Sequence, residues 1–289
     1  KASTDLKENS RANNYLQYYY HAWSSEIIYF LNQQRSLLAL QKAEKMKKQA
    51  FADRYPYGIF SCIRTMGHIY KSRGNFDLSA QYYQEALDYM LKNMPDQDPS
   101  QLYSSLAEYY RNTQKDYATA LDYCEKALKS AKTERNIAQA MIEKCLILFR
   151  QGRIDEFNDC YKEAVQMADR CKLSANVSLL IAHISKNILD KQYEQAHAHA
   201  DQLSEKGLQQ HAYIYECAKD YPNAIKYLKK YHQQLDSTNN LLQLSDIAEL
   251  NTQIGAERLK MENIQATSRY RITLFSIVTG FLLLSLLFL

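Results

Sequence analysis

The stretch GHIYKSRGNFDLSAQYYQEAL, residues 67–87, decides the fold of this chain. A small residue and an aromatic one, Gly67 and Tyr70, end an amphipathic helix. A Gly-Asn turn follows, and a second helix with small and aromatic residues is predicted to begin near Phe76. A single helix pair buries too little apolar surface to be stable, so we expect several such pairs to stack.

The same order of residue types returns four more times along the chain. The second copy has one extra residue in its turn, and the third copy is more degenerate. Aligned on the residue that follows the turn, the five copies begin their second helices at Phe76, Tyr117, Ile154, Tyr193 and Tyr221.

Small side chains are expected where the two helices of a pair cross, because larger ones would push the helix axes apart. Gly67, Ala107, Ala182 and Ala212 have this place in the pattern. Aromatic residues after each turn are expected to fill the gap between successive pairs. The residues predicted to pack the repeats are Gly67, Tyr70, Phe76, Ala107, Tyr110, Tyr117, Ala120, Tyr193, Ala196, Ala212, Tyr215, Tyr221 and Ala224.

This order and spacing closely resemble the tetratricopeptide repeat, a helix pair of about 34 residues. Most intervals here are longer, and the last is shorter. The resemblance implies an all-α fold, a right-handed α-solenoid of antiparallel helix pairs. Composition agrees, because 7 Gly and 4 Pro in 289 residues are too few for the turns of a sandwich or barrel. The 24 Tyr suit half-buried packing between helices.

The pattern divides the chain into five segments. They are a flexible N-terminus (1–14), a divergent N-terminal helix pair (15–58), the tetratricopeptide-like repeats (59–235), a helical stalk (236–271) and a transmembrane helix (272–289).

The stalk carries apolar residues at an approximate heptad spacing, which is broken at Glu257. Two interpretations stay open: the stripe pairs with a second copy of the chain as a coiled coil, or it packs on the last repeat. A helix from Asn240 to Tyr270 would be about 45 Å long. The stripe residues are Ile247, Leu250, Ile254, Met261 and Ile264.

Ile272 to Leu289 contains no charged residue and would span about 27 Å as a helix, close to the thickness of a hydrocarbon core. We therefore predict a single-pass membrane protein. The chain begins at Lys1 and ends inside this segment, so we expect a processed or truncated product. Arg269 and Arg271 alone favour a cytoplasmic repeat domain, although a more basic segment beyond Leu289 would reverse that orientation.

No sequence motif supports catalysis, a metal or a cofactor. The chain lacks HExxH, a phosphate-binding Gly-rich loop and a nucleophile elbow. His197 and His199 would point about 200° apart on a helix, so they are not expected to share a metal ion. Six cysteines without a CxxC pair favour buried free thiols. The formal charge of +4 is scattered, so this segment is expected to make no direct contact with nucleic acid.

By analogy with the repeat family, the first helices of the pairs would line a groove for an extended peptide or a partner protein. Ser105 and Glu143 stand where some family members need Asn and a cation to clamp a terminal carboxylate, so no such clamp is expected. The predicted groove residues are Arg64, His68, Lys71, Gln101, Ser104, Glu108, Arg111 and Asn112.

Degenerate tyrosine-rich repeats followed by a stalk and a membrane helix resemble the sensor part of bacterial, Bacteroidetes-type membrane-anchored regulators. This resemblance implies periplasmic repeats that relay peptide or protein binding to a cytoplasmic output domain, a transcriptional regulator or a histidine kinase. The alternative is a tail-anchored scaffold or adaptor on the cytoplasmic side, without an output domain. A long reading frame beyond Leu289 would support the regulator, and a stop codon there would support the scaffold.

Overall fold

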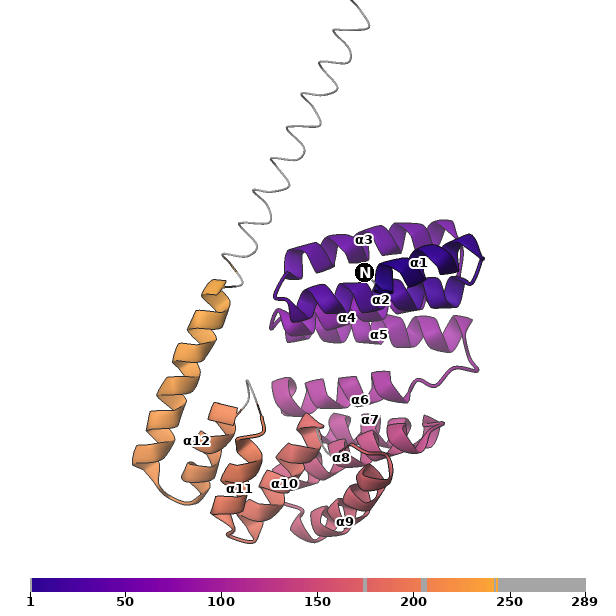
Figure 1. Cartoon of the computed structure of the whole chain (residues 1–289). Helices are drawn as coiled ribbons and strands as arrows, with labels where there is room; N and C mark the ends of the chain where they lie inside the picture. Colours follow the sequence, from indigo (N-terminus) through magenta and orange to yellow (C-terminus); the bar gives the residue numbers. More distant parts are fainter. Residues whose placement is uncertain (1, 174–175, 204–206, 242, 244–289) are drawn as a thin grey trace, which may run out of the picture. The chain divides into compact units, whose positions relative to one another are not determined.

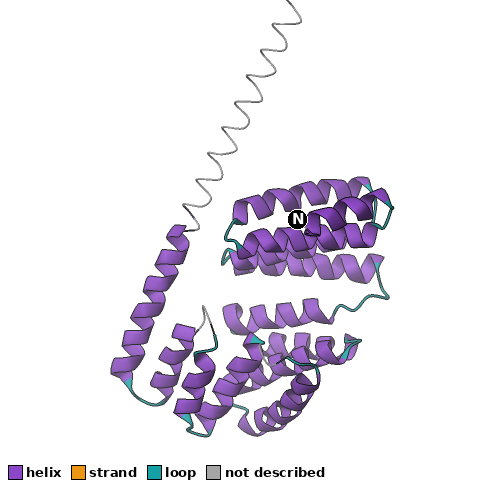
Figure 2. Ribbon diagram, in the orientation of Figure 1, coloured by secondary structure: helices purple, strands orange, loops and turns teal. Residues whose placement is uncertain are grey.

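The computed structural model describes residues 2–173, 176–203, 207–241 and 243. Every regular element within them is a helix, as Figure 2 shows. A helix also runs through residues 221–241. The other helices are α1 (Ala2–Ala12), α2 (Leu16–Asn32), α3 (Ser36–Ala52), α4 (Pro56–Ser72), α5 (Phe76–Asn93), α6 (Ser100–Tyr109), the π-helix η1 (Tyr110–Gln114), α7 (Tyr117–Ser130), α8 (Glu134–Arg150), α9 (Ile154–Arg170), α10 (Val177–Leu189), α11 (Tyr193–Ala200) and α12 (Gly207–Cys217).

The predicted membrane segment 272–289 and the predicted stalk, apart from residues 236–241 and 243, lie outside the described residues. No helix among those described is long and apolar enough to cross a membrane. The predicted boundary between repeats and stalk at residue 235 falls inside the helix 221–241.

The described helices pack as successive antiparallel hairpins (Figure 1). Each of α2, α4, α6, α8 and α10 contacts the helix that follows it, forming the pairs α2/α3, α4/α5, α6/α7, α8/α9 and α10/α11. First helices also contact the first helices of neighbouring pairs, as α2 does with α4, and α8 with α6 and α10. Helical hairpins stacked through their first helices are the arrangement that the repeat pattern predicted.

The second helices begin where the sequence alignment placed them. Phe76, Tyr117, Ile154 and Tyr193 are the first residues of α5, α7, α9 and α11, and residue 221 begins the final described helix. Side-chain caps support several helix starts: Asn75 accepts a hydrogen bond from the Leu78 amide at 3.1 Å, and Asp116 accepts one from the Thr119 amide at 3.1 Å.

Several turns between helices share one hydrogen-bonded geometry. The Arg35 amide donates to the Phe30 carbonyl at 3.0 Å, and the Asn75 amide donates to the Tyr70 carbonyl at 2.9 Å. These bonds close Schellman turns, in which one residue takes the left-handed conformation. Within residues 2–74 the left-handed residues stand at positions 14, 34, 54 and 74, an interval of 20. Most such positions hold a residue other than glycine: Asn14, Gln34, Arg54, Lys115, Lys172, Lys191 and Lys219.

The extra residue predicted in the second repeat is accommodated by η1. There the Asp116 amide donates to the Tyr110 carbonyl at 3.0 Å, one residue further back than in the other turns. The wider π-helical turn absorbs the insertion, so that α7 still starts at Tyr117.

The N-terminus differs from the predicted flexible segment 1–14, because residues 2–12 form α1, which packs on α2. Lys7 forms an ion pair with Glu26 at 2.8 Å, and Arg11 donates to Asp53 at 2.9 Å. This helix is polar, with few apolar residues, and ion pairs with residues far along the chain attach it to the array.

Small residues lie at the helix crossings, as predicted. Ala107, Ala182 and Ala212 are buried. A Cβ added at Gly67 would stand 2.6 Å from the ring of Tyr83, so α4 and α5 approach closely only because this residue has no side chain.

The aromatic residues directly after the turns differ in burial. Phe76 is 48% exposed and Tyr221 is 58% exposed, whereas Tyr117 and Tyr193 are partly buried and pack against apolar clusters, as expected of them. The position one turn later faces inward. The buried residues at that position are Ser79, Ala120, Phe157, Ala196 and Ala224.

Tyrosine pairs join first and second helices. Tyr70 stacks on Tyr82 with ring centroids 5.3 Å apart, and Tyr110 stacks on Tyr123 at 5.4 Å. Tyr215 of α12 lies 5.4 Å from Tyr227 in the last described helix. All these rings are partly buried, which is the half-buried use of tyrosine that the composition suggested.

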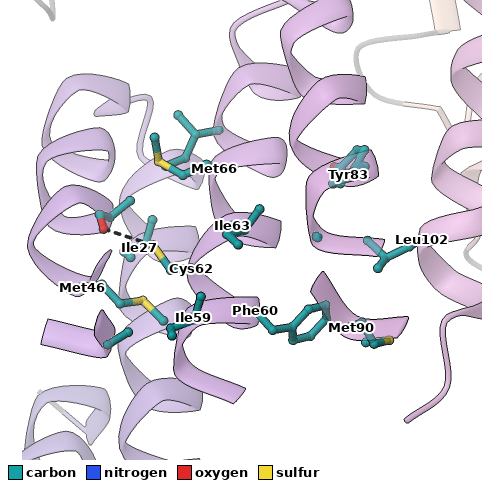
Figure 3. Close-up of a cluster of buried hydrophobic side chains, with 14 of the residues drawn as sticks. Ile27, Met46, Ile59, Phe60, Cys62, Ile63, Met66, Tyr83, Met90 and Leu102 are labelled. Atoms are coloured by element: carbon teal, nitrogen blue, oxygen red, sulfur yellow. Dashed lines mark hydrogen bonds between the residues drawn. The ribbon is translucent and has the colours of Figure 1, made fainter. Parts of the chain in front are cut away.

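The largest apolar cluster runs through α2, α3, α4, α5 and α6. Smaller clusters continue along α6 to α8, α8 to α10 and α10 to α12, so each helix shares buried surface with its neighbours. The side chains of the largest cluster in Figure 3 include Ile27, Met46, Ile63, Met66, Tyr83, Met90 and Leu102.

Candidate functional site

Two hollows open on the first helices of the pairs. The first, of about 340 Å³, lies between α2 and α4. Its cationic group is Arg64, whose Nε is buried without a hydrogen-bond partner among the described residues. The Arg64 guanidinium also lies 5.3 Å from the centre of the Phe60 ring. The lining residues are His21, Ser24, Ser25, Ile28, Tyr29, Asn32, Arg64, Thr65 and His68.

The second hollow, of about 300 Å³, is formed by α6, α8 and the N-terminal end of α10. Hydroxyl, amide and carboxylate groups line it, and none of its lining residues among those described is aliphatic or aromatic. Such groups can donate to and accept from the main chain of an extended peptide. The lining residues are Gln101, Ser104, Ser105, Glu108, Gln139, Glu143, Asn176 and Ser178.

Two ion pairs connect the helices that line the hollows. Lys71 of α4 lies 2.6 Å from Glu108 of α6. Arg111 of η1 donates from Nε to Oε1 of Glu143 in α8 at 2.5 Å and from a terminal nitrogen to Oε2 at 3.2 Å. Both residues of the second pair are buried, so the pair is shielded from water and from screening by salt.

The charges in this region shift several pKa values. Burial raises the pKa of the Glu143 carboxyl, and the neighbouring Arg111 charge opposes that rise. Desolvation by the surrounding protein lowers the pKa of His68, and the positive charges of Arg64 and Lys71 lower it further. Nδ1 of His68 lies 2.9 Å from the Tyr83 hydroxyl, so a neutral imidazole can accept that hydrogen bond.

The structure brings most predicted groove residues to the hollows. Arg64 and His68 line the first, while Gln101, Ser104 and Glu108 line the second. Lys71 lines neither hollow, but it forms an ion pair with Glu108, which lines the second.

Arg111 is not the exposed groove residue that the sequence predicted. It is 7% exposed and paired with Glu143. Arg111 is the second residue of η1, and its guanidinium reaches the Glu143 carboxylate on α8. Asn112 is exposed and accepts a hydrogen bond from Arg111 at 2.8 Å, but it lines neither hollow.

Sequence reasoning did not identify the contributions of α2, α8 and α10 to these hollows. The structure relates α2 to α4, because left-handed turn residues recur at an interval of 20 through position 74, but three of these four positions hold a residue other than glycine, so the sequence alone does not show the interval. Two such intervals relate α2 to α4, so Ser24 and Ile28 occupy the places of Arg64 and His68. The overlooked lining residues are His21, Ser24, Ser25, Ile28, Tyr29, Asn32, Gln139, Asn176 and Ser178.

The histidines of α11 have separate partners. Nδ1 of His197 lies 2.7 Å from Nδ1 of His211, whereas His199 stacks on His183 with ring centroids 4.9 Å apart. Within the described part of the chain, no group of three or more His, Cys, Asp or Glu residues is arranged to hold a metal ion.

Comparisons with known proteins agree with this architecture. Residues 64–98 match the family model of the tetratricopeptide repeat. No curated protein sequence matches the chain. The solved structure of NprR in complex with its cognate peptide NprX has a similar fold, with a TM-score of 0.51 and 17% identity over 79% of this chain and 71% of that chain.

Two other solved structures are less similar. BtubC (BKLC) from P. vanneervenii has a TM-score of 0.45 and 17% identity, over 72% of this chain and 92% of that chain. PilF of Pseudomonas aeruginosa has a TM-score of 0.47 and 10% identity, over 84% of this chain and 99% of that chain.

Proposed function

We propose that this tetratricopeptide-repeat protein binds an extended peptide, or a segment of a partner protein, along the first helices of its pairs. The observation that carries the proposal is the second hollow, where three first helices present hydroxyl and amide groups to one space. A peptide in extended conformation offers unpaired N–H and C=O groups along its length, and such a lining can satisfy them. The proposed function involves no chemical step.

The fold similarity to NprR supports a peptide as the ligand, because that protein was solved with its cognate peptide. The two hollows suggest a division of roles. The second would hold the peptide main chain, and the first would select side chains through Arg64 and the exposed ring of Tyr29.

A random-peptide display library, selected against the full chain, tests the proposal. Selected peptides are then measured by calorimetry against the wild type and the double variant Ser104→Ala/Gln139→Ala. Both side chains line the second hollow and are partly exposed. Loss of two hydrogen bonds is expected to weaken binding by about tenfold, since each contributes roughly 0.5–1.5 kcal/mol.

The matched control is Lys129→Ala/Lys162→Ala, which changes exposed residues on the second helices α7 and α9. Its affinity for the same peptides should equal that of the wild type. The proposed site would be refuted if the selected peptides bound the control variant more weakly than the wild type but bound Ser104→Ala/Gln139→Ala as tightly as the wild type. Arg64→Gln separately tests whether the first hollow sets the preferred peptide sequence.

We also propose that residues 272–289 anchor the chain in a membrane and that the repeats belong to the sensor of a signalling protein. The uncharged sequence from Ile272 to Leu289 supports the anchor, and the order of repeats, stalk and apolar segment supports the sensor. On this proposal the repeats lie in the periplasm, the stalk pairs with a second copy, and ligand binding is relayed to a cytoplasmic output domain.

Vesicle flotation tests the anchor. The full chain should float with phospholipid vesicles, and a chain ending at residue 271 should stay in the dense fraction. Equal behaviour of the two chains would remove the anchor from the proposal. The second candidate, a tail-anchored scaffold on the cytoplasmic side, is favoured by Arg269 and Arg271 and predicts a stop codon soon after Leu289.

A further inference from the structure

Two cysteine side chains from the helices of one hairpin meet inside the array. Cys145 of α8 and Cys160 of α9 have their sulfur atoms 2.8 Å apart. A disulfide has an S–S distance of about 2.05 Å, so bond formation requires a movement of less than about 1 Å. The other described thiols have different surroundings: Cys62, for example, donates to the Ala43 carbonyl at 3.3 Å.

The two thiols differ in access and acidity. Cys145 is completely buried, whereas Cys160 is partly exposed. Donation of a hydrogen bond from Cys145 lowers the pKa of Cys160, and the positive charge of Lys144 lowers it further. The same hydrogen bond, together with burial, raises the pKa of Cys145. Cys160 is therefore the thiol that an oxidant in solution meets first and the one that ionises more readily.

We propose that Cys145 and Cys160 are a modification site that forms an intrahairpin disulfide by exchange with a small-molecule disulfide. The Cys160 thiolate attacks one sulfur of the small disulfide, forms a mixed disulfide with it and releases one thiolate. Cys145 then loses its proton and attacks the Cys160 sulfur, which releases the second thiolate. Overall, the two protein thiols are oxidised to one disulfide, and the small-molecule disulfide is reduced to two thiols.

The bond would cross-link the hairpin that carries part of the second hollow. Cys145 stands two positions after Glu143, which lines that hollow and binds Arg111. A covalent link between α8 and α9 restricts the unfolded chain and holds α8 against its partner helix. The site needs no peptide ligand, so it stands independently of the proposed groove function.

The experiment treats the folded full chain with oxidised glutathione and then blocks the remaining thiols with an alkylating reagent. Proteolysis without reductant, followed by mass spectrometry, should recover a peptide linked through Cys145 and Cys160. Free thiols should fall from six to four. The oxidised chain should also unfold at a temperature higher by on the order of 5 °C than the reduced chain.

Single variants separate the two roles. Cys145→Ser should stop at a stable glutathione adduct on Cys160, because the resolving thiol is missing. Cys160→Ser should acquire no adduct on the buried Cys145. The control Cys62→Ser, which removes a different buried thiol, should still form the linked peptide.

Three results would overturn the site: six free thiols after treatment of the folded chain, a linked peptide that joins other cysteines, or a link that forms only in denaturant. Circular dichroism of each variant confirms that loss of the link does not follow from loss of the fold.

Discussion

Gly67 of α4 lies directly against the ring of Tyr83 of α5, with no room between them for a methyl group. Gly67→Ala is therefore expected to lower the free energy of unfolding by about 1–2 kcal/mol, because overpacking against a buried ring outweighs the roughly 1 kcal/mol that Ala gains over Gly in a helix. Urea denaturation measures the change. Ser72→Ala, at an exposed position on the same helix, should change stability by less than about 0.5 kcal/mol. A Gly67→Ala protein as stable as the wild type would show that α4 and α5 can separate at no cost.

The buried pair of Arg111 and Glu143 gives a second prediction. Arg111→Met leaves an unpaired buried carboxylate and should destabilise the protein by about 3–5 kcal/mol, whereas Arg111→Met/Glu143→Leu should recover most of the loss. Chemical denaturation of both single variants and the double variant gives the coupling energy. Additive losses would mean that the two residues act separately.

Asp53 should make stability depend on acid. Its carboxylate accepts hydrogen bonds from Arg11, Tyr20 and Gln49, and the bond from Arg11 contributes most to lowering its pKa from 3.8 to about 2. A lowered pKa in the folded state means that this stabilisation is present above pH 3.8 and is lost as the pH falls toward 2. The stability difference between wild type and Asp53→Asn should therefore shrink over this window. Urea denaturation of both proteins across this window measures the difference, and a difference that stays constant would contradict the role of Asp53.

The left-handed turn residues predict a gain in stability. Lys191 has φ of 58°, a conformation that costs a residue with a side chain more than it costs glycine. Lys191→Gly should raise the free energy of unfolding by about 0.5–1 kcal/mol, while Lys162→Gly inside α9 should lower it by about 1 kcal/mol. Thermal unfolding of the two variants should give shifts of opposite sign. Shifts of the same sign would contradict the proposed role of the turn.

The parts of the fold that depend on local signals were predictable from sequence. Helix starts such as Phe76 and Tyr117 follow turn and cap residues, and Ala107 is small because its helix crosses a partner. Each of these signals lies within a few residues of the feature that it predicts.

The features that sequence reasoning did not find depend on contacts between distant residues. Helix α1 has few apolar residues and is attached by Arg11 to Asp53, a contact between residues 42 positions apart that its own sequence does not indicate. Arg111 is buried because it pairs with Glu143, a residue 32 positions away in the chain. The approach of Cys145 to Cys160 depends on how one degenerate hairpin packs.

For the candidate site, the resemblance to the repeat family indicated which residues would line the groove, and Arg64, His68 and Glu108 line the hollows. Which of those side chains remain available for a ligand depends on ion pairs between neighbouring helices. Lys71 is paired with Glu108, and this pairing could not be derived from spacing within a single repeat.

The regular turns of the N-terminal half have an evolutionary consequence. Left-handed residues at positions 14, 34, 54 and 74 make the single helix, rather than the helix pair, the unit that recurs there. Recombination at two such turns that lie two helices apart would remove or duplicate a complete hairpin and leave every remaining junction unchanged. Homologues of this chain should therefore differ in length by whole hairpins in this region, with few smaller insertions inside the helices.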